Sequence, residues 1–137
     1  MITGNMVKNV SANRYFDEGI TNMKFNITFD DVKVSGEDVD VLYTFTTSYV
    51  NTQGKAEKQV GDLKIAGSIK AKENKGSADE IQKTWSGKKT LPTAFAEDII
   101  NLLNFECGSR GTLLASSIGL VAPLPLSRAK LEPTKPQ

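Results

Sequence analysis

The sequence predicts an α+β fold, a four-stranded antiparallel sheet followed by a short helix and a long helix packed on one face. Apolar and polar residues alternate in four runs between residues 6 and 72, and a period of two is typical of half-buried strands. Short polar segments join the runs, which favours antiparallel neighbours with one solvated face. After Ser77 the apolar residues recur at helical spacing instead.

The first two strands are expected over Met6–Tyr15, after a frayed end at Met1–Asn5, and over Asn22–Phe29. In the second strand alternation is strict, with Asn, Lys and Thr separating the apolar residues Met23, Phe25, Ile27 and Phe29. Val32 and Val34 extend this pattern past two aspartates.

The third strand, Val39–Val50, carries the strongest pattern. Its β-branched and aromatic residues suit a pleated surface, and one face holds Val39, Val41, Tyr43, Phe45, Thr47 and Tyr49. The fourth strand, Gly61–Lys72, alternates again, with Leu63, Ile65, Gly67, Ile69 and Ala71 on one face.

Two helices are expected after the strands. Ser77 and Glu80 form a capping box that starts the short helix, and Gly87 is a plausible C-terminal stop. The long helix covers Leu91–Leu120, with Pro92 in its first turn.

Two adjacent apolar stripes run along the long helix, and together they are wider than one contact needs. Gly108 and Gly111 interrupt it, at a cost of about 1 kcal/mol each relative to Ala. They predict a kink, a break, or a place where another backbone comes close.

At 137 residues the chain fits one domain, which we place over residues 1–131, with a disordered tail over 132–137. Leu124 and Leu126 alternate with Pro123 and Pro125, so this part is expected to lie extended against the domain.

Composition excludes several classes of function. With 17 basic and 16 acidic residues the net charge is +1, which argues against a dedicated nucleic-acid binder. The absence of histidine removes Ser-His and Cys-His nucleophile pairs and histidine metal sites. A single cysteine fits a reducing compartment. We see no secretory signal and no apolar run near the ~18 residues of a membrane span. We therefore expect a soluble cytoplasmic protein that binds neither nucleic acid nor membrane and has no catalytic site, cofactor or metal.

Three local patterns have a functional and a structural interpretation. The acidic group Asp30, Asp31, Glu37, Asp38 and Asp40 could bind a cation or a basic partner, or form a solvated turn whose edge charges prevent aggregation. Cys107 lies on an apolar stripe, where a buried, unreactive thiol is expected. Trp85 could be a ligand platform, but its spacing from Ile81 favours packing.

Several short motifs occur in order along the chain: Val10–Arg14, Val41–Phe45, Gly61–Gly67, Trp85 before Leu91 and Pro92, Ala96 with Ile99 and Ile100, Gly111 with Leu114, and Pro123–Leu126. Their order and spacing resemble those of the export chaperone SecB and its stand-alone homologues, over roughly Val7 to Leu131. The resemblance implies a four-stranded antiparallel sheet with helices on one face. It also implies homodimers or homotetramers, and an ATP-independent holdase that keeps unfolded or nascent polypeptide in apolar surface grooves.

The chain departs from the exporter in two ways. Its tail carries Lys130 and Lys135 without cysteine or histidine, so zinc-linked docking on the translocase ATPase is not expected. Met23–Phe29 has Asn and Lys where the exporter has acidic docking residues. Homologues include chaperones of toxin–antitoxin systems, which leaves the client open. The alternative fold is a hot-dog-like enzyme, in which the long helix usually lies among the strands rather than after them.

The expected client-binding residues lie on the sheet, the short helix and the tail: Phe25, Phe29, Tyr43, Phe45, Trp85, Leu124 and Leu126. The alternative makes the aromatic residues core. The long helix is expected to carry an oligomer interface at Leu102, Gly108, Gly111 and Leu113. The alternative function is a non-catalytic structural or adaptor subunit without chaperone activity.

Overall fold

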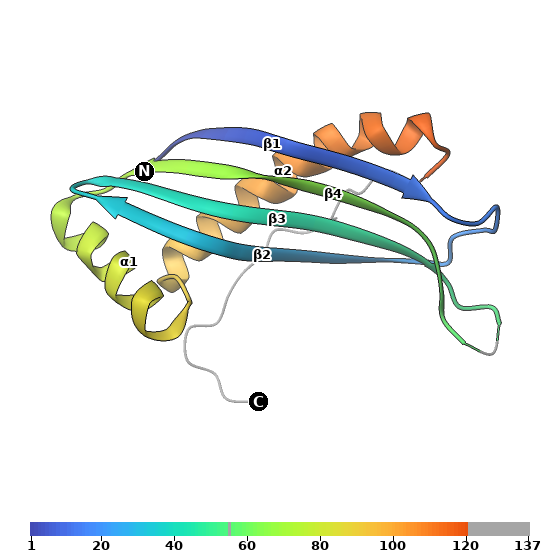
Figure 1. Cartoon of the computed structure of the whole chain (residues 1–137), viewed down its shortest axis with the longest axis horizontal. Helices are drawn as coiled ribbons and strands as arrows, with labels where there is room; N and C mark the ends of the chain where they lie inside the picture. The colour runs from blue at the N-terminus through green and yellow to red at the C-terminus, as the bar shows by residue number, and fades with distance from the viewer. Residues whose placement is uncertain (55, 121–137) are drawn as a thin grey trace.

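Four long strands form one sheet, and two helices lie on one side of it (Figure 1). The computed structural model describes residues 1–54 and 56–120. The elements are β1 (Ile2–Arg14), β2 (Asn22–Ser35), β3 (Asp38–Asn51), β4 (Lys58–Lys72), α1 (Lys75–Lys88) and α2 (Thr93–Ser117). The predicted α+β fold, with all strands before both helices, is confirmed.

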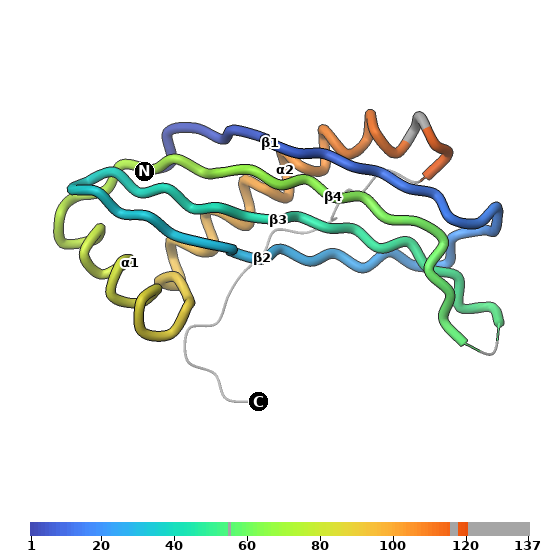
Figure 2. The backbone as a smooth tube through the Cα atoms, in the orientation of Figure 1, coloured from blue at the N-terminus to red at the C-terminus, as the bar shows by residue number. Residues whose placement is uncertain are grey.

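The strands are antiparallel in the order β1-β4-β3-β2, so the first two strands form opposite edges of the sheet. The connection between them crosses the end of the sheet, as the backbone trace shows (Figure 2). There the N–H of Tyr15 donates to the carbonyl of Val60 at 2.7 Å, and that of Thr21 to Val50 at 2.9 Å. Among the described residues, β1 pairs only with β4 and β2 only with β3.

The start of β1 corrects the expectation of a frayed end. Ile2 pairs with Ala71 and Asn5 pairs with Ile69, so the strand begins at Ile2. The polar residues at this end are compatible with a strand because β1 is at an edge, where one side of the strand is open.

The inner face of the sheet, which faces the helices, holds the core. The predicted inner residues of β3 are at most 2% exposed: Val39, Val41, Tyr43, Phe45, Thr47 and Tyr49. In β4, Leu63, Ile65 and Ile69 are fully buried. The outer face holds mainly polar residues such as Thr44, Thr46 and Lys64. The predicted sheet with one wet face is therefore confirmed.

A β-bulge at Asp30 keeps the end of β2 on the inner face. Phe29 pairs with Tyr43 and Asp31 with Leu42, so one residue of β2 is left unpaired between them. Strict alternation after Phe29 would place Val32 and Val34 on the outer face. The extra residue shifts the alternation by one, so both valines remain on the core side. The Asp30 carboxylate accepts the hydroxyls of Thr28 at 3.0 Å and Thr44 at 2.6 Å.

Helix α1 begins and ends beyond the predicted residues. Its N-cap is Asn74, whose side-chain oxygen accepts the N–H of Ser77 at 2.8 Å. Asn is as good an N-cap as Ser, and it comes one turn earlier. At the other end Lys89 takes φ +55° and donates its N–H to Trp85, so Gly87 lies within the helix.

Helix α2 is continuous through both glycines, so the predicted kink or break does not occur. Gly108 and Gly111 are buried. Gly111 shares the stripe of Cys107 and Ala115, which are fully buried against the rest of the chain.

Candidate binding surfaces

The expected client-binding residues divide between core and surface. Tyr43, Phe45 and Trp85 are 1%, 0% and 7% exposed, so they correspond to the alternative that made them core. Trp85 is not the rim of an open groove, because α1 turns its Ile81–Trp85 side into the core. Leu124 and Leu126 lie outside the described residues, as does the predicted tail.

The surface part of that set lies on the outer strand β2. Phe29 is half-buried and Phe25 is 38% exposed. The ring of Phe25 lies 6.4 Å from that of Phe45, tilted by 52°. Met23 and Ile27 are half-buried on the same side. We call Met23, Phe25, Ile27 and Phe29, with the open backbone of the strand, the β2 edge.

The helices cover only part of the inner face next to β2. Helix α1 packs on β2, and Figure 1 shows it beside the turn between β2 and β3. Helix α2 runs diagonally behind the sheet, from the β2 side near α1 to the β1 side at the other end, so it diverges from the start of β2 (Figure 1). This explains why the β2 edge is more exposed than the equivalent face of β3.

The expected oligomer-interface residues also differ in how exposed they are. Leu113 is 76% exposed, whereas Leu102 is half-buried and packs against the core. Gly108 and Gly111 are buried within the chain and are not open to a partner backbone. The sequence interpretation missed Phe105, which is 73% exposed. Its position three residues after Leu102 was the available signal.

A polar cluster joins β1, β3 and α2 beneath the sheet. The Tyr43 hydroxyl donates to Asn5 Oδ1 at 2.7 Å, and Asn5 Nδ2 donates to the carboxylate of Glu106. Glu106 also pairs with Arg110 at 3.3 Å. Burial raises the pKa of Tyr43 to about 12 and that of the neighbouring Cys107 to about 11. A thiol with this pKa stays protonated at neutral pH, so Cys107 is not a nucleophile there.

Two of the acidic residues around the turn between β2 and β3 lie close to lysines of the neighbouring strand β4. Asp40 pairs with Lys70 at 2.5 Å, and Asp38 lies 4.0 Å from Lys72. Among the residues that the structure describes, no three His, Cys, Asp or Glu side chains are grouped closely enough to hold a metal ion. These contacts favour the solvated-turn interpretation of the acidic group.

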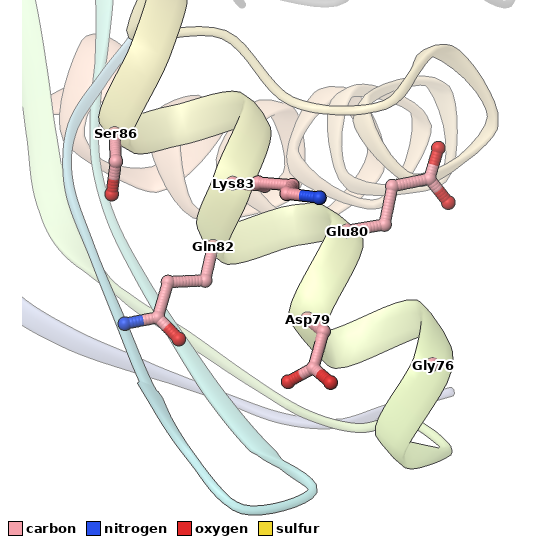
Figure 3. A pocket seen from close by; sticks show the side chains of 6 residues that line it. All are labelled: Gly76, Asp79, Glu80, Gln82, Lys83 and Ser86. Carbon is pink, nitrogen blue, oxygen red and sulfur yellow. The ribbon is translucent and has the colours of Figure 1, made fainter.

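A hollow of about 690 Å³ lies along the solvent side of α1. Every residue that lines it comes from α1, and the labelled side chains spread along the helix instead of converging (Figure 3). Converging polar groups are what a small-molecule site needs, so this hollow does not form one.

No helix in the described part of the chain is long and apolar enough to cross a membrane. Family models of known proteins give no match to the chain. A search of curated proteins also gives no match. The function is therefore argued from the surfaces above.

Proposed function

We propose that this chain is a non-catalytic polypeptide-binding module of the ATP-independent holdase type. It captures extended segments of unfolded or nascent protein along the β2 edge. The observation that supports this most directly is a 14-residue edge strand that pairs on one side only among the described residues and carries half-buried apolar side chains on its inner face. The SecB-like order of motifs agrees with this proposal.

The chemistry of the β2 edge suits an extended client. A strand at the edge of a sheet has backbone groups that can pair with another chain. A client strand added there gains main-chain hydrogen bonds, while every second side chain meets the inner face. Phe25 and Ile27 would contact those side chains. Because backbone pairing is independent of sequence, the preference for any one client sequence is weak.

Charged residues on β2 protect this edge from uncontrolled pairing. Lys24 pairs with Glu57 at 2.7 Å on the opposite side of the strand, and Lys33 is exposed. Lysines on edge strands are a common defence against aggregation. A client can therefore bind while the protein itself stays dispersed.

Assembly with a second copy is part of the proposal, and it uses the opposite edge. Strand β1 is open, and its Val10 is 45% exposed on the inner side. Leu113 of α2 is exposed on the half of the helix that follows Glu106, the residue bonded to β1. Pairing two β1 strands would join two sheets and bring two α2 helices together. Such a dimer leaves both β2 edges free.

A cytoplasmic place of action also belongs to the proposal. The chain's one cysteine, Cys107, is buried and has no second cysteine to pair with, which fits a reducing compartment. Unfolded and nascent chains are available there.

The test is suppression of aggregation when a chemically unfolded protein is diluted, followed by light scattering at one client per assembly. We expect suppression by the native sequence and a clear loss with Phe25→Ser. Asn26→Ser, the neighbouring residue on the outer face, should suppress normally. Circular dichroism and light-scattering mass should be unchanged in both variants.

The alternative, a structural or adaptor subunit, makes a different prediction in the same experiment. If the native chain assembles but suppresses nothing at any ratio, the holdase proposal is wrong and the adaptor function is favoured. Equal suppression by Phe25→Ser would show that clients bind elsewhere.

A further inference from the structure

Two hollows that share Asp98 follow the first half of α2, and no residue of β2 lines either of them among the described residues. One, of about 240 Å³, lies between α1 and α2, and the other, of about 470 Å³, lies between α2 and Ile2 at the start of β1. The first lies against Ile81 and Phe95, and the second against Leu102 and Phe105. We call the two hollows together the α1–α2 groove.

The apolar part of the groove has the length and spacing of a helix-binding site. On α2, the residues Ala94, Asp98, Leu102 and Phe105 line it from one stripe of the helix. The stripe runs from Ala94 to Phe105, which is twelve residues and a rise of roughly 16 Å at 1.5 Å per residue, about three helical turns. Phe105 is 73% exposed and accessible to a partner, whereas Ile81 and Phe95 line the first hollow and are buried. A helix placed in such a groove contacts it through residues i, i+4 and i+7.

The charges around the groove have one sign. Glu73, Glu80 and Asp98 line it, and among the residues that the structure describes neither hollow is lined by a lysine or an arginine. Glu73 pairs with the amino group of Met1 at 2.8 Å. Glu80 and Asp98 are exposed and form no ion pair with any described residue. Figure 3 shows Glu80 leaving α1 on the side opposite to Gln82 and Ser86. In a chain of net charge +1, this is a local segregation of charge.

We propose that the α1–α2 groove binds a cationic amphipathic helix of a partner protein. Apolar side chains of the partner would lie against Leu102 and Phe105, and its lysines or arginines would face Glu80 and Asp98. Carboxylates at a groove rim mainly speed association and select the sign of the partner's charge. The inference does not depend on client binding at the β2 edge.

A second copy of this chain is a poor occupant of the groove. The apolar residues of α1, Ile81 and Trp85, are buried in their own core. The outward stripe of α2 carries Asp98 itself, and its nearest basic residue, Arg110, is paired with Glu106. Neither described helix presents an apolar stripe flanked by free basic residues.

The experiment uses the full chain and two synthetic peptides of about four turns, each labelled with a fluorophore. Both peptides have leucine at i, i+4 and i+7; one has lysine flanks and the other glutamate flanks. We expect saturable binding of the lysine peptide by fluorescence anisotropy, and at least ten-fold weaker binding of the glutamate peptide. Binding of the lysine peptide should weaken as salt rises.

Matched variants locate the site. The double variant Glu80→Gln with Asp98→Asn should weaken binding of the lysine peptide by at least five-fold. Asp79→Asn removes a carboxylate from the same helix outside the groove and should bind normally. Phe105→Ser should weaken binding of the lysine peptide. None of these exposed positions should alter suppression of aggregation, whereas Phe25→Ser should leave peptide binding intact.

Three results would overturn the inference. One is equal binding of the two peptides or normal binding by the double variant. Another is a change in oligomer size with Phe105→Ser, which would show that a second copy occupies the groove. The third is displacement of the lysine peptide by a synthetic peptide of residues 121–137, which carries three basic residues and one acidic residue. That result would assign the groove to the chain's own C-terminal segment.

Discussion

The two sides of α2 carry the same kinds of side chain in opposite environments. Ile99, Leu103 and Cys107 are fully buried on the sheet side. Phe105 and Leu113 are 73% and 76% exposed on the other side. Leu103 and Phe105 are two residues apart and both strongly apolar. The difference shows that apolar character does not distinguish a residue that packs in the core from one that lies on the surface.

The buried and exposed sides of α2 have different proposed roles, one in packing and the other in binding. Its buried side joins the sheet through packing and through the Glu106–Asn5–Tyr43 bonds. Its open side contributes Phe105 to the α1–α2 groove and Leu113 to the side shared with β1. Exposed apolar groups of this size usually mark interaction sites when they are contiguous. Variants on the two sides should therefore affect different measurements.

The largest expected effect is on the buried side. Leu103→Ala should lower the free energy of unfolding by about 2–5 kcal/mol, because it removes buried methyl groups and leaves a cavity. The change is measured by urea denaturation at pH 7. A loss below about 1 kcal/mol would mean that α2 does not pack on the sheet as described.

The stability of the buried side is also expected to depend on pH through Cys107. In the unfolded chain the Cys107 thiol ionises near its ordinary pKa of 9.0, whereas burial raises the pKa to about 11 in the fold. The folded state therefore holds more protons between these values. Its stability is complete below pH 9 and falls as pH rises toward 11. At about 1.4 kcal/mol per pKa unit, ionisation of this thiol should lower the free energy of unfolding by about 2 kcal/mol at pH 10.5.

The measurement compares urea midpoints at pH 8 and pH 10.5 for the native chain and Cys107→Ala. The variant removes the titrating group, so its stability should fall less over this range. An equal fall in both proteins would show that the thiol is not buried. Tyr43, with a pKa raised to about 12, adds to the fall in both.

A smaller effect is expected from the polar cluster on the buried side. Tyr43→Phe removes the hydroxyl that donates to Asn5 Oδ1 and should lower stability by about 1 kcal/mol. Tyr15→Phe is the control, because its hydroxyl bonds Asp62 at 2.8 Å in an exposed position. That change should cost less stability than Tyr43→Phe does, because water replaces the lost bond at an exposed position. Similar losses for both variants would argue that burial adds nothing to the Tyr43 bond.

The smallest effect on stability is expected on the open side. Phe105→Ala should change the free energy of unfolding by no more than about 0.5 kcal/mol, because its side chain is exposed and alanine favours the helix. Urea denaturation beside Leu103→Ala gives the direct comparison. A loss near that of Leu103→Ala would place Phe105 in the core and remove it from the groove.

Much of the fold could be predicted because strand patterns are local. Alternation alone identified Val39–Val50 and placed all six of its inner residues correctly. Helix ends were less predictable, because Asn74 and Ser77 are both good N-caps and only the backbone geometry selects between them. The bulge at Asp30 was also hidden, although the three-residue step from Phe29 to Val32 indicated it in retrospect.

The candidate surfaces could be predicted less well than the fold. Aromatic residues on strands indicate burial and binding equally, so Tyr43, Phe45 and Trp85 could not be separated from Phe25. The α1–α2 groove combines Glu73, which follows β4, with residues of α1 and α2. No spacing within the sequence brings Glu73 and Asp98 together, so no local pattern could have shown it.

By itself, the sequence determined which elements form and which side of each strand is apolar, since periodicity depends on neighbouring residues alone. It also determined that α2 has more apolar surface than one contact uses. The strand order β1-β4-β3-β2, the place of β2 at an edge, and the stripe of α2 that meets the sheet could be read from the folded structure alone. These depend on which distant segments become neighbours and cover one another. Burial is a property of that arrangement, and so the same apolar residue is core at Leu103 and surface at Phe105.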